Sequence, residues 1–122
     1  MSMLGNHIRT NVHKNLRERA RTFYLDILRC QPMAAPLSDL DLFVFENQFV
    51  LGVFYVEDAD CLTESEHLKA AWLEIKVKNP EEVKQRLIAF GVKEVTYADP
   101  TRFYFQAPGG QVFRLAPEDG DI

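Results

Sequence analysis

The stretch "WLEIKVKNPEEVKQRLIAFGV", residues 72–92, contains a strand followed at once by a helix. Residue character alternates over its first six positions, which is the period of a β-strand with one buried face. The apolar face carries Leu73, Ile75 and Val77. The opposite face carries Trp72, Glu74 and Lys76. We therefore predict a half-buried strand that packs its apolar face against the helix that follows it.

The helix in this stretch has both a start signal and a stop signal. Asn79 is placed to cap it, Pro80 suits the first helical position, and Gly91 suits the left-handed conformation that ends many helices. Its predicted buried stripe consists of Val83, Leu87, Ile88 and Phe90. The runs "KEVTYA", "TRFYFQA" and "QVFRLA" then alternate like strands, so this half is predicted to form a strand, a helix and three strands.

The first half of the chain repeats this order. The run "NHIRTNV" alternates between one face with Ile8, Thr10 and Val12 and another with His7, Arg9 and Asn11. A helix capped by Asn15 is expected next. The runs "LDLFVFE" and "FVLGVFYVE" are typical of strands joined by a turn at Asn47 and Gln48. The chain is therefore predicted to be a duplicated module.

This duplication predicts an α+β fold, in which tandem βαβββ modules form a curved mixed sheet around a cavity with the helices on its outer side. We assign the first module to residues 6–57, a polar connector to residues 58–71 and the second module to residues 72–117. All three parts are expected to lie in one domain that spans residues 1–122.

Composition limits the classes of function. Of the 122 residues, 47% are hydrophobic and 26% charged, which is typical of a soluble globular protein, and no apolar run is long enough to cross a membrane. The net charge of −4 argues against general nucleic-acid binding. We expect the basic cluster "HKNLRERAR" to be a solvated helix face, with Arg17, Arg19 and Arg21 pointing outward. The first residues lack the pattern of a secretory signal, so we predict a cytoplasmic protein whose Cys30 and Cys61 are free thiols.

The residues on the sheet faces away from the helices are predicted to line the cavity. Aromatic rings are too numerous for the helix-facing side alone, so some of them are expected here. The candidate ligand-binding residues are His7, Arg9, Phe54, Trp72, Glu74, Lys76, Tyr104 and Arg114. An apolar lining with a few orienting polar groups is typical of small-molecule sites. Arg114 is expected either to bind an anionic ligand group or to form an ion pair with Glu74, and both alternatives stay open at this point.

Together these stretches resemble the superfamily of glyoxalases, bleomycin-resistance proteins and extradiol dioxygenases, whose fold is called vicinal oxygen chelate. The resemblance rests on "HIRTNV" with "NLRERARTFYLDIL", on "WLEIKVKNPEEVKQRLIAFGV" and on the closing hairpin "RFYFQAPGGQVFRL". It covers the chain from His7 to Leu115. It implies paired modules around a ligand cavity, and assembly of two chains into a homodimer.

Enzymes of this superfamily hold a divalent metal ion between the modules with His or Glu side chains. The resemblance places His7, Trp72 and Arg114 at three of the ligand positions and the strand "VLGVFY" at the fourth. Only His7 is a metal-binding side chain, because a guanidinium cation has no lone pair to donate and repels a cation. We therefore predict no metal site and no cofactor.

Three functions are compatible with these observations. The first is metal-independent binding of a small organic molecule, aromatic or anionic, as in the resistance members of the superfamily. The second is a glyoxalase-like lyase or isomerase with His7 or Glu74 as general base and Arg114 or Lys76 stabilising an oxyanion. The third is a structural or interaction module without a ligand. A homodimer suits all three, and the expected partner is a small molecule rather than nucleic acid or a membrane.

Overall fold

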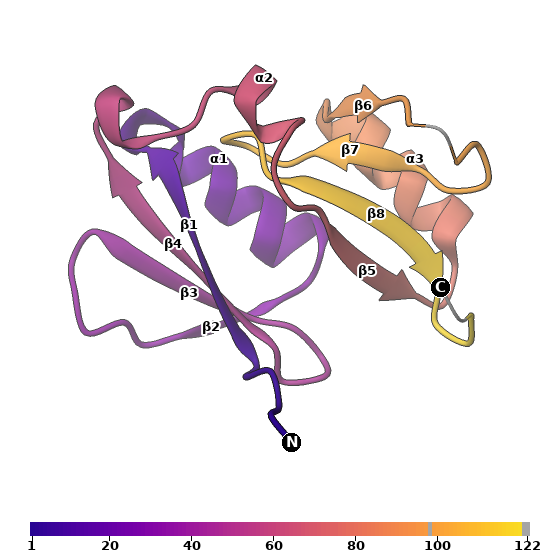
Figure 1. Ribbon diagram of the computed structural model, residues 1–122, viewed down its shortest axis with the longest axis horizontal. Coiled ribbons are helices and arrows are strands. Elements are labelled where there is room, and N and C mark those ends of the chain that lie inside the picture. Colours follow the sequence, from indigo (N-terminus) through magenta and orange to yellow (C-terminus); the bar gives the residue numbers. More distant parts are fainter. Residues whose placement is uncertain (98, 121–122) are drawn as a thin grey trace. The chain divides into compact units, whose positions relative to one another are not determined.

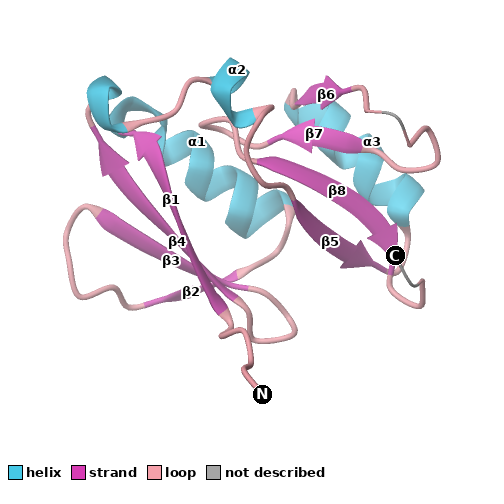
Figure 2. Cartoon of the chain, viewed as in Figure 1, coloured by secondary structure: helices cyan, strands magenta, loops and turns pink. Residues whose placement is uncertain are grey.

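The computed structural model describes residues 1–97 and 99–120. The chain divides into two compact units, Met1–Cys61 and Leu62–Ile122. Each unit contains one four-stranded mixed sheet together with helices (Figures 1 and 2). The prediction of an α+β fold built from tandem βαβββ modules is confirmed. The described strands form one sheet in each unit rather than one continuous sheet.

The first sheet contains one strand, β2 (Gln31–Met33), that the sequence analysis did not locate. Its strands are β1 (His7–His13), β2 (Gln31–Met33), β3 (Leu40–Val44) and β4 (Val50–Val56), in the order β1-β4-β3-β2. β1 runs parallel to β4, and the other neighbours are antiparallel. β2 was missed because its three residues are exposed and show no apolar alternation. It pairs with β3 at the edge of the sheet, where Met33 lies opposite Leu42.

The helical segment after β1 changes its winding along its length. A 3-10 turn over Lys14–Leu16 leads into α1 (Arg17–Arg21), which continues as a π-helical turn over Thr22–Ile27. The expected cap at Asn15 was wrong, because the segment begins earlier and Nδ1 of His13 accepts a hydrogen bond from the Asn15 backbone N–H at 3.1 Å. Ala20, Phe23 and Tyr24 are buried, and Tyr24 stacks on Phe43 of β3 with ring centroids 4.7 Å apart.

The second unit repeats the topology of the first. Its sheet consists of β5 (Leu73–Val77), β6 (Lys93–Val95), β7 (Tyr104–Gln106) and β8 (Val112–Pro117), in the order β5-β8-β7-β6. β5 runs parallel to β8, as β1 does to β4, and the other neighbours are antiparallel. The helix α3 (Pro80–Phe90) follows β5 at the position that α1 holds after β1.

The signals that predicted α3 are only partly correct. Pro80 begins the helix and Gly91 ends it with φ 101°, as expected. Asn79 does not cap a backbone N–H, and its amide instead contacts the Glu82 carboxylate at 3.5 Å. Val83 and Leu87 are buried, but Ile88 is 48% exposed, so its place in the buried stripe was wrong. Val83 and Leu87 are four residues apart on one face, and Ile88 lies about 100° further around the helix.

A short helix precedes the second sheet. α2 (Glu64–His67) begins with a capping box, in which the Thr63 hydroxyl and the Glu66 carboxylate each accept a backbone N–H of the other residue. The side-chain amide of Gln106 on β7 donates to the carbonyl oxygens of Glu64 and Gly110, at 2.8 and 2.9 Å. These bonds attach α2 to the turn between β7 and β8.

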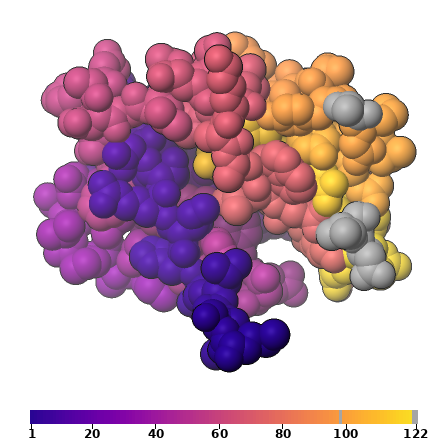
Figure 3. Space-filling model, viewed as in Figure 1, coloured from indigo at the N-terminus to yellow at the C-terminus, as the bar shows by residue number. Residues whose placement is uncertain are grey.

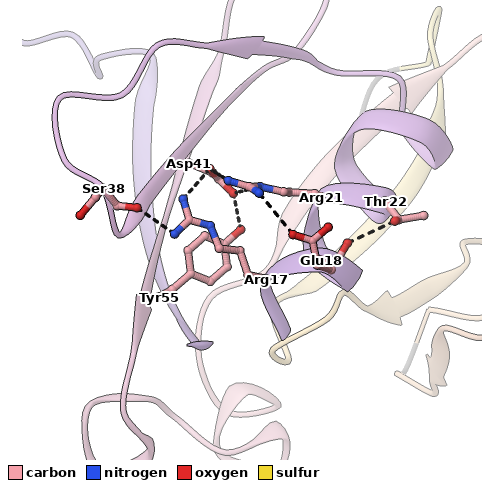
Figure 4. A network of polar contacts seen from close by, with 7 residues as sticks. All are labelled: Arg17, Glu18, Arg21, Thr22, Ser38, Asp41 and Tyr55. Atoms are coloured by element: carbon pink, nitrogen blue, oxygen red, sulfur yellow. Dashed lines mark hydrogen bonds and ion pairs between the residues drawn. The ribbon is translucent and has the colours of Figure 1, made fainter. Parts of the chain in front are cut away.

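A charged network links the first helix to β3 (Figure 4). Asp41 lies in register with the buried Val53, and its carboxylate accepts hydrogen bonds from Arg17, Arg21 and the Tyr55 hydroxyl at 2.8–3.0 Å. Arg17 and Arg21 therefore do not simply point into solvent, and that expectation was wrong. A carboxylate with only 15% of its side chain exposed requires cationic partners, and these arginines provide them.

The first residues project from the packed part of the first unit (Figure 3). Met1, Met3 and Leu4 are almost fully exposed. Within residues 1–97 and 99–120, no helix has the length and apolar character needed to cross a lipid bilayer.

Candidate functional site

The sheet face of the second unit that points away from the apolar core carries a row of functional side chains. The residues in register across β7, β8 and β5 are Tyr104, Arg114 and Glu74, because Arg114 pairs with both of the others. Their neighbours in sequence, such as Phe105, Phe113 and Ile75, are buried on the opposite face. The alternation of strand residues therefore brings three residues from distant parts of the sequence to one level of the face opposite the apolar core.

Arg114 forms an ion pair with Glu74. Its Nε donates to Oε2 of Glu74 at 3.0 Å, and its Nη2 donates to the same oxygen. The hydrogen bond to Glu74 raises the pKa of Arg114; burial opposes this shift, and Tyr104 adds a smaller contribution that also raises it. Of the two alternatives left open by the sequence, the structure contains the ion pair. Arg114 is buried, with 11% of its side chain exposed, and 19% of the Glu74 side chain is exposed.

Aromatic rings surround this ion pair. The guanidinium carbon of Arg114 lies 4.6 Å from the centroid of the Trp72 ring, within the range of a cation–π contact. Trp72 meets Tyr104 edge to face with centroids 5.7 Å apart, and Tyr104 meets Tyr97 in the same way at 4.8 Å. Trp72 still keeps 41% of its surface exposed. The cluster thus presents an indole ring whose orientation is held by its neighbours.

Two members of this cluster were not among the predicted site residues. Asp99 places its Oδ2 3.8 Å from Nη1 of Arg114, and Tyr97 donates its hydroxyl to the Leu68 carbonyl at 3.2 Å. Hydrogen bonds from the side chain and the backbone of Thr101 lower the pKa of Asp99. Both residues lie in the loop between β6 and β7, where strand alternation gives no indication of direction. The only indication of these two site residues in the sequence was an acidic residue close to an aromatic one in that loop.

Lys76, a further predicted site residue, lies two positions beyond Glu74 on β5, opposite Ala116. Its ammonium group donates to the carbonyl oxygen of Gly120. The side chain therefore fastens the turn that follows β8. It is engaged by the backbone rather than by the Glu74–Arg114 pair.

The other predicted site residues form a separate cluster on the first sheet. Arg9 lies over the Phe54 ring, with its guanidinium carbon 4.1 Å from the ring centroid, and its Nε donates to Oδ1 of Asn11 at 3.2 Å. His7 is exposed and approaches Gly52, where an added Cβ would lie 3.3 Å from its Nε2. Arg9 of β1 lies opposite Gly52 of β4, and Glu74 of β5 lies opposite Arg114 of β8 in the same way. The two units therefore carry different side chains at equivalent positions.

These two βαβββ units define the architecture known as the vicinal oxygen chelate fold. Solved structures with this architecture superpose on the chain. A protein from Bacillus anthracis assigned to the glyoxalase family has a TM-score of 0.70 and 22% identity, and the match covers 94% of this chain and 95% of that one. The trypanothione-dependent glyoxalase I of Leishmania major has a TM-score of 0.69 and 19% identity, with 96% and 88% covered.

A resistance protein has the same fold. The genomically encoded fosfomycin resistance protein FosX from Listeria monocytogenes matches with a TM-score of 0.70 and 15% identity, covering 100% of this chain and 94% of that one. No protein-family sequence model matches the chain, and no curated protein sequence matches it. The similarity therefore establishes the fold predicted from the sequence, that of the glyoxalase, bleomycin-resistance and dioxygenase superfamily.

The donor set does not fit the metal ion that this fold holds in enzymes. At the positions assigned to metal ligands, His7 offers an imidazole, whereas Trp72, Arg114 and the strand "VLGVFY" offer no metal-binding group. Arg114 instead places a fixed positive charge there and binds the nearest carboxylate, Glu74. Among the described residues, no three His, Cys, Asp or Glu side chains are grouped so that they could hold a metal ion.

Proposed function

We propose that this chain binds a small planar organic molecule on Trp72, beside the sheet face that carries Glu74 and Arg114, without using a metal ion. The observation that carries the proposal is the environment of Trp72. Arg114 covers one face of the indole and Tyr104 meets it edge to face, yet the ring remains 41% exposed. An aromatic side chain that is held in place but accessible loses little conformational freedom when a ligand stacks on it.

Polar groups beside the ring support the same proposal. The side chains of Glu74 and Asp99 are 19% and 38% exposed, so their oxygen atoms remain within reach of a ligand that lies on Trp72. Small-molecule sites typically combine apolar contact area with a few such orienting groups. The cluster has both components within one unit of the chain.

Binding is favoured over catalysis by the state of Glu74. A general base must direct a lone pair at the proton that it removes. Oε2 of Glu74 already accepts two N–H groups of Arg114, so a lyase or isomerase that used this oxygen would first have to break the ion pair. We therefore propose that the bound molecule leaves chemically unchanged.

Fluorescence of Trp72, the only tryptophan, provides the test. We expect planar aromatic fragments to quench its emission saturably, and chromatography with mass detection to recover them unaltered. Trp72→Leu is expected to weaken binding, measured by calorimetry, by about tenfold or more. The matched control is Ile88→Ala, which removes another exposed apolar side chain, on α3, and should leave the affinity unchanged. Recovery of an altered fragment would favour the lyase or isomerase function instead.

Two further parts of the proposal have independent tests. Elemental analysis of purified protein is expected to find no stoichiometric zinc, nickel, manganese or iron, and a stoichiometric metal would overturn metal independence. We also propose a homodimer, which light scattering after size-exclusion chromatography would detect as twice the mass of the chain.

A further inference from the structure

We propose, on the basis of the proposed function, that this site accepts planar aromatic ligands that are neutral or positively charged and discriminates against anions. An arginine in a binding site ordinarily suggests an anionic ligand. Here the guanidinium group of Arg114 already has its own counter-charges.

Carboxylates of the chain itself surround Arg114. Its Nε and Nη2 are bound by Oε2 of Glu74, and its Nη1 lies 3.8 Å from Oδ2 of Asp99. The positive charge of Arg114 thus already faces two carboxylates, and one of them binds two of its nitrogen atoms. An anion that approaches Arg114 must either displace Glu74 or lie between two like charges.

The other cations near this face are engaged elsewhere. Lys76 donates to the carbonyl of Gly120, and Lys93 lies 3.6 Å from the carboxylate of Glu64. The rings of Tyr97 and Tyr104 also belong to the cluster, and the Tyr97 hydroxyl donates to the Leu68 carbonyl oxygen. Arg102 also lies near Asp99 and contributes to lowering its pKa, and its Nη1 donates to the carbonyl oxygen of Thr101 at 3.2 Å.

A ligand without negative charge meets no such obstacle. It can stack on the exposed part of the Trp72 ring and donate hydrogen bonds to the carboxylates of Glu74 and Asp99. The two carboxylates therefore determine specificity, because they accept hydrogen bonds from donor groups of the ligand and repel negatively charged groups. The anionic ligand considered from the sequence is the class that this arrangement disfavours.

Three probes of equal shape separate charge from aromatic stacking. Benzamidine, benzamide and benzoate carry a positive charge, no charge and a negative charge on the same ring. Trp72 supplies a single indole N–H signal in a nitrogen–proton correlation spectrum, so its shift during titration gives a dissociation constant for each probe. We expect benzoate to bind at least about tenfold more weakly than benzamide, and benzamidine to bind no more weakly than benzamide.

Removing a carboxylate charge should weaken the discrimination against benzoate. Glu74→Gln keeps the shape of the side chain but frees Arg114, so benzoate is expected to bind about tenfold more tightly than in the unmodified protein. Asp99→Asn, at a more exposed position, should act in the same direction by a few fold. Glu94→Gln is the control, because Glu94 lies on β6 in register with the buried Phe105 rather than with Arg114.

The outcomes separate this inference from the proposed function. If no planar aromatic probe shifts the Trp72 signal saturably, both fail. If all three probes bind equally, or benzoate binds best to the unmodified protein, the aromatic site stands and the charge selectivity is wrong. If Glu74→Gln and Asp99→Asn both leave the benzoate affinity unchanged while their spectra remain those of a folded protein, the carboxylates do not determine specificity.

Discussion

Glu74 lies directly opposite Arg114 in the parallel pair of β5 and β8, and one oxygen of its carboxylate accepts hydrogen bonds from two nitrogen atoms of the guanidinium group. In the first unit the corresponding pair is Arg9 and Gly52. The duplicated fold therefore carries an internal ion pair in one module and none at the equivalent positions of the other. This difference makes the second unit the chemically distinctive half of the chain.

Breaking this pair is expected to destabilise the fold. Glu74→Ala leaves Arg114, with only 11% of its side chain exposed, without its main partner. We expect the free energy of unfolding to fall by about 1.5–3 kcal/mol, and Glu74→Gln to have a smaller effect because an amide oxygen still accepts one N–H. Urea unfolding measures both. Glu118→Ala, at an exposed carboxylate after β8, should stay within about 0.5 kcal/mol, and a Glu74→Ala variant that matched it would contradict the prediction.

Asp41 is expected to make the stability of the protein depend on pH under acidic conditions. Burial alone would raise the pKa of this carboxyl group, but hydrogen bonds from Arg21, Tyr55 and Arg17 outweigh burial and lower it. The folded state then binds fewer protons than the unfolded state. The contribution to stability is present above about pH 4, the ordinary pKa of an aspartate, and is lost as the pH falls through the lower pKa of the folded state.

The variant Asp41→Asn isolates this effect. At pH 7 it should lower the free energy of unfolding by about 2 kcal/mol, because Asn cannot neutralise Arg17 and Arg21. The difference from the unmodified protein should shrink between pH 4 and pH 2, measured by urea unfolding. Asp26→Asn, which removes an exposed carboxylate from the same helical segment, is the control. A difference that stayed constant with pH would show that Asp41 does not titrate as proposed.

Gly110 is expected to tolerate no side chain. Its φ is 108°, and an added Cβ would lie 2.7 Å from Cδ2 of the buried His67. Gly110→Ala should therefore destabilise the protein by about 2 kcal/mol or more, through backbone strain and displacement of α2. Gly5→Ala is the matched control, since nothing lies within 4 Å of its added Cβ. If thermal unfolding gave the two variants the same midpoint temperature, that result would falsify this prediction.

The two thiols are expected to differ in reactivity. Burial raises the pKa of Cys30 to about 12, and Cys30 is only 5% exposed. Cys61 is partly exposed; burial, and then the nearby Asp58 and Asp60, raise its pKa. In native protein at pH 8, Ellman's reagent should react with one thiol, and with the second only after denaturation. Cys61→Ser should remove the native reaction and Cys30→Ser should retain it; the reverse pattern would contradict the assignment.

Local patterns in the sequence determined most of the elements. Alternation placed Glu74 and Lys76 on one face of β5, and the proline and glycine signals located both ends of α3. These features depend on residues near one another in the chain, so the sequence alone specifies them. The short edge strand β2 escaped prediction because pairing with β3, rather than its own composition, makes it a strand.

The candidate site depended on contacts that no local pattern encodes. The sequence determined that Arg114 alternates with Phe113 and Leu115, and therefore that it lies on the face opposite to theirs. Strand register decided that its partner is Glu74, and the loop before β7 decided that Asp99 also approaches it. Helix packing likewise turned Arg17 and Arg21 from expected surface charges into partners of Asp41. The physical reason is common to these cases. A charged group with little contact to water forms an ion pair with the nearest opposite charge, and only the tertiary structure brings that charge close to it.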